Sequence, residues 1–302
     1  MQSGKKLKVS IYMITYNQEK HIEESIESVV NQKTSFNYKL FIGEDCSTDN
    51  TRKICIKLKE KYPDKIHLIL NEHNLGATRN AKNIFNLCFE SGADYIALIE
   101  GDDYWTDPLK LQKQIDFLEN NPEYSISFHK VKEVSTSGEE QYTVLNSPET
   151  EQTLTIEDLA KGNCIHTPSV VFRKNMEILP EWLPYSPIGD YPLHMLNAEF
   201  GLIKYFPEEM AAYRIGDGMW SSQTRAFQLV NTLFALKLLI THFKQNKNVK
   251  KILSEQSNFL MDELTQIQKV QIDFDPEKAA YNLSLKKLFV ILIRKLRYSL
   301  KR

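Results

Sequence analysis

Three carboxylates, Glu100, Asp102 and Asp103, follow directly after the apolar segment 95–99. That segment is typical of a buried strand, so the carboxylates would stand at the edge of the core. Carboxylates this close repel one another, and removing them from water costs several kcal/mol unless a positive group is near. A divalent cation bound to a phosphate is the usual partner of such hard oxygen ligands. The plainer alternative is a turn, because aspartate favours turns and helix starts.

Polar side chains follow other predicted strands in the same way. The run Thr15-Tyr16-Asn17 comes after the apolar segment 9–14, Asp45 follows 38–43, and the polar run 71–74 follows 66–70. Ligands of parallel α/β sheets bind beyond the carboxyl ends of the strands, so these groups predict one site. There Tyr16 could cover a base, and Asp45 could accept a hydrogen bond from an imide N–H. Such contacts would hold uracil or thymine.

Strands and helices alternate through the first 130 residues. The pattern predicts strands at 9–14, 38–43, 66–70, 95–99 and 125–131, and helices at 19–32, 47–62, 77–90 and 108–119. The first helix carries apolar residues at helical spacing, for example Ile22, Ile26 and Val29. This alternation predicts an α/β protein in which helices cover both faces of a parallel sheet.

The pattern changes after residue 131. Polar composition at 135–155 predicts a mobile loop or weak hairpin, followed by a short capped helix at 155–161. We expect strands at 169–172, 202–206 and 210–213, and a helix from 190 to 200. Beyond residue 222 the pattern is helical, at 224–243, 249–268 and 283–302. The chain is therefore expected to end in a helical extension.

Composition excludes several classes of function. The 302 residues carry a formal net charge of −1, which gives no whole-chain argument for nucleic-acid binding. The four cysteines form no Cys-x-x-Cys pair, as in a cytosolic protein with reduced thiols. No apolar stretch approaches the roughly 20 residues that span a bilayer. The sequence also lacks the glycine-rich dinucleotide fingerprint and the P-loop, which disfavours hydride transfer and P-loop ATP hydrolysis.

Five short motifs occur in the order and approximate spacing of family 2 glycosyltransferases, which the chain resembles over about residues 8–220. They are Thr15-Tyr16-Asn17, Glu44-Asp45-Cys46-Ser47-Thr48-Asp49, Asn74-Leu75-Gly76, Gly101-Asp102-Asp103 and Gly189-Asp190. The resemblance implies the GT-A fold, a nucleotide-binding α/β/α sandwich with a mixed, mainly parallel sheet. It also implies transfer of a sugar from a nucleotide-sugar donor, often UDP-linked, with inversion at the anomeric carbon and with Mg²⁺ or Mn²⁺ on the diphosphate.

The resemblance also implies roles for single residues. Asp103 matches the metal-contacting residue, and Asp190 matches the catalytic base, although Asp190 could simply cap a helix. The residues expected on the donor side are Thr15, Tyr16, Asn17, Asp45, Arg79, Asp102 and Arg214. Arg214 or Trp220 would substitute for a histidine that many relatives carry near 214–221. A second departure is Cys46, which stands where glycine is common, so the turn there would be adjusted.

The predicted domain organisation has two parts. A GT-A domain is expected at 1–222, with a nucleotide-sugar-binding half at 8–130 and an acceptor half at 131–222. A helical extension at 223–302 would end in a basic amphipathic tail, because residues 286–302 contain seven basic and no acidic side chains. Such a tail can bind an anionic membrane surface through 283–302, which predicts a cytoplasmic protein peripheral to the inner face of the cell membrane. The alternative is a helix that docks on its own domain or on a second subunit.

The sequence therefore predicts an inverting, metal-dependent glycosyltransferase of polysaccharide biosynthesis, acting on a glycan or a lipid-linked acceptor. Two alternatives remain. A sugar nucleotidyltransferase usually carries a glycine-rich basic loop after its first strand, where this chain has Tyr16 and Asn17. A non-catalytic binding scaffold on the same fold would be favoured by loss of the acidic residues, yet Asp103 and Asp190 are both present.

Overall fold

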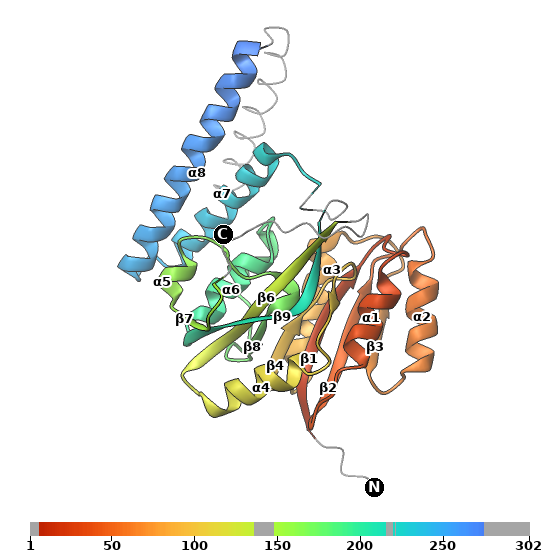
Figure 1. The fold of residues 1–302 in the computed structure, drawn as a ribbon. Coiled ribbons are helices and arrows are strands. Elements are labelled where there is room, and N and C mark those ends of the chain that lie inside the picture. Colours follow the sequence, from red (N-terminus) through yellow and green to blue (C-terminus); the bar gives the residue numbers. More distant parts are fainter. Residues whose placement is uncertain (1–5, 136–147, 216–219, 221, 275–302) are drawn as a thin grey trace.

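In a computed structural model that describes residues 6–135, 148–215, 220 and 222–274, a nine-stranded mixed sheet forms the centre of the protein (Figure 1). Its strands lie in the order β3 (Ile66–Leu70), β2 (Asn37–Glu44), β1 (Leu7–Thr15), β4 (Tyr95–Leu98), β8 (Val171–Arg173), β6 (Tyr124–Ser135), β9 (Leu202–Ile215) and β5 (Tyr104–Trp105), and β7 (Gln152–Leu154) pairs with β9. The first four strands in this order run parallel. β8 reverses the direction against both β4 and β6.

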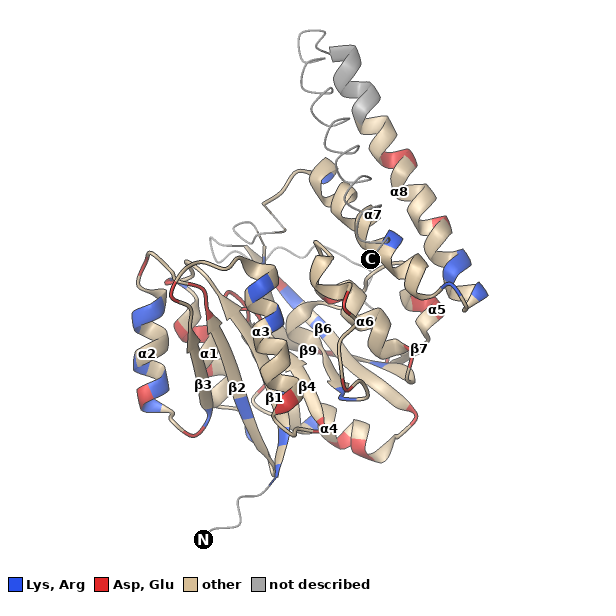
Figure 2. Ribbon diagram, turned by 180° about the vertical axis from the view of Figure 1, so that it is seen from behind, with Lys and Arg blue, Asp and Glu red and all other residues tan. Residues whose placement is uncertain are grey.

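Helices cover both faces of this sheet (Figures 1 and 2). One face carries α1 (Ile22–Val30), α2 (Thr51–Lys61) and α4 (Lys110–Asn120), and the other carries α3 (Ala77–Glu90) and α6 (Asp190–Ala198). Alternation along β1 explains the two layers, because Ile11 and Met13 belong to one buried cluster and Tyr12 belongs to the other. The mixed, mainly parallel α/β sheet expected from the sequence is confirmed.

Most predicted elements are present, but one prediction is wrong and two short strands were not anticipated. The strands expected at 202–206 and 210–213 form the single strand β9, in which the register against β6 shifts between the pairs His129–Phe206 and Val131–Ala211. Pro207 lies in this shift, where a missing backbone N–H is tolerated. The two-residue strand β5 and the three-residue strand β7 were not expected. β7 lies inside 135–155, the stretch expected to be a loop or weak hairpin, and pairs antiparallel with β9.

The chain ends, among the described residues, in two long helices, α7 (Arg225–His242) and α8 (Lys247–Phe274). An earlier short helix, α5 (Ile156–Leu159), begins with a capping box at Thr155. Leu236 and Leu239 of α7 and Leu253 of α8 belong to the same buried cluster as the α3 face of the sheet. α8 then extends away from the sheet beside α7 (Figure 1). None of the described helices is both long enough and apolar enough to cross a membrane, and the tail 283–302 lies outside the described residues.

Candidate functional site

The carboxylate turn stands at the end of β4, in the middle of the sheet. Carboxylate oxygens of Glu100, Asp102 and Asp103 all lie within 4.8 Å of one another. The chain still runs beside β1 at this point, since the Gly101 N–H donates to the carbonyl of Ile14 at 3.2 Å. A Cβ on Gly101 would lie 2.8 Å from the Thr15 side chain and 2.3 Å from Oε1 of Gln18. Glycine is therefore required for the turn to reach this position.

Two oxygens of this cluster accept no hydrogen bond from any described residue, although both are buried: Asp102 Oδ1 and Asp103 Oδ2. Asp103 is 1% exposed, and burial together with the neighbouring carboxylates raises its pKa well above the ordinary value. Burial also raises the pKa of Asp102, and burial with the charges of Asp102 and Asp190 raises the pKa of Glu100 to about 8. Hard oxygen ligands that are buried, close and unpaired fit a divalent cation such as Mg²⁺ or Mn²⁺.

Arg214, near the end of β9, reaches the same turn from the other half of the sheet. Its backbone N–H donates to Asp103 Oδ1 at 2.9 Å, and its guanidinium donates to the backbone carbonyl of Asp102. The guanidinium carbon lies 4.6 Å from the centre of the Tyr104 ring. The structure therefore brings Arg214 to the carboxylate turn, as a donor-side role requires.

Asp190 is the first residue of α6. Its charge is the last of three causes, after burial and the charge of Asp102, that raise the pKa of Glu100. Asn163 donates to Asp190 Oδ2 at 3.1 Å. One turn further along α6, His194 is fully buried, and burial lowers its pKa to about 4, so its imidazole is neutral at neutral pH. The helix-cap alternative finds no support, because Gly189 is the N-cap and α6 has no side-chain cap hydrogen bond.

Asp45 lies after β2 and is 2% exposed. Its Oδ1 accepts hydrogen bonds from Asn71 Nδ2 at 2.8 Å and from the Leu75 N–H at 2.9 Å. Its Oδ2 accepts from the Gly76 N–H at 2.9 Å. Both oxygens thus tie the turn after β2 to the loop that leads into α3. A contact between Asp45 and a nucleotide base would have to use the remaining lone pairs.

The other predicted donor residues line the same edge of the sheet. Thr15 is buried and donates to Gln18 Oε1 at 2.7 Å, whereas the Tyr16 ring is 43% exposed. Asn17 has a φ of 53°, and its Oδ1 accepts from the Thr48 N–H at 2.8 Å. Arg79 is exposed in the first turn of α3. An exposed aromatic ring and an exposed cation are both free to meet a ligand.

Cys46 keeps the backbone of a glycine. Its φ of 59° lies in the left-handed region, which glycine adopts at little cost and other residues rarely adopt. The turn is therefore not adjusted to the side chain, and Cys46 bears the strain.

Two groups of this site were not anticipated from the sequence. Glu100 is not one of them, because it belongs to the three carboxylates expected to meet a divalent cation. Asn163, the hydrogen-bond partner of Asp190, carries no sequence signal because it lies 27 positions away in an irregular segment. Glu24, an ion-pair partner of Arg214, lies on the polar face of α1 among other glutamates.

The fold and the site together define an α/β protein with a cluster of three carboxylates, a candidate ligand set for a divalent cation, at the carboxyl edge of its sheet. The family model described as glycosyl transferase family 2 matches residues 10–178. The chain therefore belongs to glycosyl transferase family 2. The matched residues include the carboxylate turn, whereas Asp190 and Arg214 lie beyond them, so their placement here rests on geometry.

Relatives and solved structures agree with this assignment. An uncharacterised protein of Mycobacterium tuberculosis is 33% identical over 268 residues, which cover 85% of this chain and 75% of that protein. A putative teichuronic acid biosynthesis glycosyltransferase of Bacillus subtilis, TuaG, is 29% identical over 157 residues, 52% of this chain and 58% of that protein.

Two solved structures share the fold. The structure of S. aureus TarS 1–349 in complex with UDP-GlcNAc has a TM-score of 0.61 at 19% identity and covers 90% of this chain and 78% of that one. The mannosyltransferase PcManGT from Pyrobaculum calidifontis, in complex with GDP-Man and Mn²⁺, has a TM-score of 0.59 at 12% identity, covering 95% of this chain and 81% of that one. At these identities the likeness concerns the GT-A fold alone.

Proposed function

We propose that this protein is an inverting, metal-dependent glycosyltransferase that moves a sugar from a nucleotide-sugar, UDP-linked, to a hydroxyl of a glycan or lipid-linked acceptor in polysaccharide biosynthesis. One observation carries the proposal: the cluster of three carboxylates at the end of β4, with two buried oxygens that accept no hydrogen bond from any described residue. Membership of the family supports glycosyl transfer. Two structures of similar fold are complexes with UDP-GlcNAc, and with GDP-Man and Mn²⁺, which supports a nucleotide-sugar donor and a divalent cation. The name of one relative, a teichuronic acid biosynthesis glycosyltransferase, supports a role in polysaccharide biosynthesis.

Asp103, together with Asp102 and Glu100, would hold Mn²⁺ or Mg²⁺. When bound, the cation supplies a Lewis acid that stabilises the charge gained by the leaving nucleoside diphosphate. Desolvation and mutual repulsion raise the pKa of Glu100 and of Asp103, so these groups favour the protonated form unless a cation is bound. Asp102 would lie between the cation and the donor ribose, with one carboxylate oxygen toward each. Thr15, Tyr16, Asn17, Asp45, Arg79 and Arg214 would line the rest of the donor site.

Asp190 would act as the general base. The acceptor hydroxyl loses its proton to the Asp190 carboxylate while its oxygen attacks the anomeric carbon from the face opposite the diphosphate. Asn163 holds Oδ2 of Asp190 at 3.1 Å and so orients the carboxylate. A single displacement of this kind needs no covalent enzyme intermediate, and it inverts the anomeric carbon.

The test is a screen of nucleotide-sugars for hydrolysis and transfer with Mn²⁺ or Mg²⁺, run on the wild type, Asp103→Ala and Asp190→Asn. We expect Asp103→Ala to lose the metal-dependent rate, and Asp190→Asn to slow transfer by about 10²–10⁴-fold. Activity of Asp103→Ala equal to that of the wild type would reject the metal assignment. A wild type that binds nucleotide-sugars without turning any over would favour a binding scaffold, and release of pyrophosphate from a sugar phosphate and a nucleoside triphosphate would favour a nucleotidyltransferase.

The basic segment 283–302 is proposed to bind an anionic membrane surface, which would keep the enzyme beside a lipid-linked acceptor on the cytoplasmic face. The segment lies outside the described residues, so the support comes from the sequence, in its basic charge and in the helical spacing of its apolar residues. We expect the full chain to sediment with anionic liposomes and a chain that stops at Asn282 to stay in the supernatant. Equal sedimentation of both forms would reject this part of the proposal.

A further inference from the structure

The side chain of Arg214 contacts three groups, in addition to the hydrogen bond that its backbone N–H donates to Asp103. Its guanidinium forms an ion pair with Glu24 of α1 and donates to the Asp102 carbonyl. It also lies over the Tyr104 ring, 4.6 Å from the ring centre. The Arg214 side chain is 12% exposed, so these contacts fix a largely buried cation beside three carboxylates.

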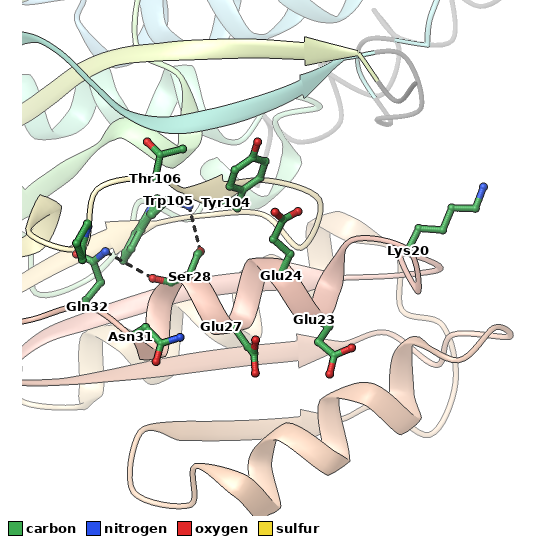
Figure 3. A pocket seen from close by; sticks show the side chains of 11 residues that line it. Lys20, Glu23, Glu24, Glu27, Ser28, Asn31, Gln32, Tyr104, Trp105 and Thr106 are labelled. Atoms are coloured by element: carbon green, nitrogen blue, oxygen red, sulfur yellow. Dashed lines mark hydrogen bonds between the residues drawn. The ribbon is translucent and has the colours of Figure 1, made fainter. Parts of the chain in front are cut away.

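Glu24 differs in its partner from the two glutamates beside it on α1. Glu23 pairs with Lys57 at 3.1 Å and Glu27 pairs with Lys61 at 2.8 Å, and both lysines belong to α2. Glu24 instead turns toward Tyr104 in a groove of about 600 Å³ between α1 and β5 (Figure 3). Of the three, Glu24 is therefore the carboxylate that connects α1 to the metal-site turn.

The ion pair with Glu24 affects the position of the Arg214 guanidinium. A guanidinium binds carboxylates well, and Asp102 and Asp103 each hold one buried oxygen that accepts no hydrogen bond from the part of the chain that the structure describes. With Glu24 and the Asp102 carbonyl engaged, the guanidinium is kept on the backbone side of the turn. Without Glu24 it would be drawn to the carboxylate oxygens, where it would compete with a cation for the same ligands.

We infer that Glu24 is a positioning residue: by pairing with Arg214 it keeps the guanidinium off the Asp102 and Asp103 oxygens and leaves them open to a divalent cation. This inference rests on the proposed function, because it assumes that these carboxylates hold the metal. Glu24 touches neither metal nor substrate, and it acts through Arg214.

The test measures Mn²⁺ binding by the full chain without donor or acceptor, from the loss of the free Mn²⁺ signal in electron paramagnetic resonance. Glu24→Gln is expected to weaken Mn²⁺ binding about tenfold, the size typical of losing a group that orients a metal ligand. Glu24→Asp should recover part of the affinity. Glu23→Gln, which removes the neighbouring pair with Lys57, is the matched control and should bind Mn²⁺ as the wild type does.

Thermal unfolding of each variant is measured alongside, and Glu24 is exposed enough that the fold should survive the change: its side chain is 55% exposed. Equal Mn²⁺ affinity of Glu24→Gln and the wild type would overturn the inference and leave the proposed function standing. Equal weakening by Glu23→Gln would also overturn it, since the effect would then come from the general charge of α1. A wild type that neither binds Mn²⁺ nor turns over a nucleotide-sugar would reject the proposed function together with the inference.

Discussion

Two turns at the same edge of the sheet carry buried aspartates, and the protein treats them in opposite ways. After β2, Asp45 gives both oxygens to hydrogen bonds from Asn71, Leu75 and Gly76. After β4, Asp102 and Asp103 each keep one buried oxygen that no described residue serves. Burial raises the pKa of Asp102, and burial together with the charges of Asp102 and Glu100 raises the pKa of Asp103.

The difference separates an aspartate whose two oxygens are hydrogen-bonded within the fold from two aspartates that each keep one buried oxygen open. Donation from two backbone N–H groups and an amide offsets the cost of burying the Asp45 carboxylate. At the β4 turn the described donors leave part of that cost without compensation, since Arg214 donates to only one oxygen of Asp103. The proposed cation would supply the missing counter-charge.

Among the changes that test this comparison, the largest expected effect comes from Asp102→Asn, which keeps the shape of the side chain and removes its charge. We expect the Mn²⁺-dependent transfer rate to fall by about 10²–10³-fold, as when one electrostatic group at a transition state is lost. The melting temperature should stay equal or rise, since one of three repelling carboxylates is gone. Steady-state transfer assays and thermal unfolding of the same preparations test both points, and a marked fall in melting temperature would show that Asp102 also completes the fold.

The second effect is a dependence of stability on pH that originates at the β4 turn. The pKa of Glu100 is raised from 4.5 to about 8, so the folded protein binds more protons than the unfolded chain between these values. Stability contributed by this group is complete below pH 4.5 and is lost as the pH rises through 8. Urea unfolding of the metal-free protein at pH 5 and pH 8 should show this loss, and Glu100→Gln should reduce it. Identical pH profiles of the two proteins would contradict the prediction.

These first two predictions concern residues that can be recognised in the sequence, and much of the fold can be predicted from the sequence as well. The helix at 77–90 and the strand at 66–70 are predicted with their observed ends, because Gly76 stands before a clear helical spacing and an apolar run is bounded by polar residues. β5 has two residues, too few to show any period. Its pairing with β9 depends on contacts made more than 100 positions along the chain.

The site divides in the same way. The carboxylate turn is local, and its three acidic side chains cluster as the sequence predicts. The pairing of Arg214 with Glu24 joins residues 190 positions apart, and Glu24 looks like any glutamate on an exposed helix face. The hydrogen bonds that satisfy Asp45 come from backbone groups, which the side-chain pattern does not reveal.

The third prediction applies the same isosteric change to the satisfied aspartate. In Asp45→Asn an NH₂ group would face a backbone N–H of Leu75 or Gly76, leaving a buried donor unpaired. We expect the free energy of unfolding to fall by about 1–3 kcal/mol. Urea denaturation measures it, with Asp116→Asn on the outer face of α4 as the control for the loss of one charge. An unchanged free energy of unfolding would mean that Asp45, like Asp102, is kept for a ligand.

The smallest expected effect concerns the residue next to Asp45. Cys46 holds a φ of 59°, a conformation that costs a side chain roughly 1–2 kcal/mol. Cys46→Gly removes this strain but gives the unfolded chain more freedom, which costs about 0.5–1 kcal/mol. The free energy of unfolding should therefore rise by no more than about 1.5 kcal/mol, and chemical denaturation of matched samples can resolve the sign. A clear loss of stability would show that the Cys46 thiol, which donates to the Glu72 carbonyl at 3.5 Å, contributes more to the Asp45 turn than its strained backbone costs.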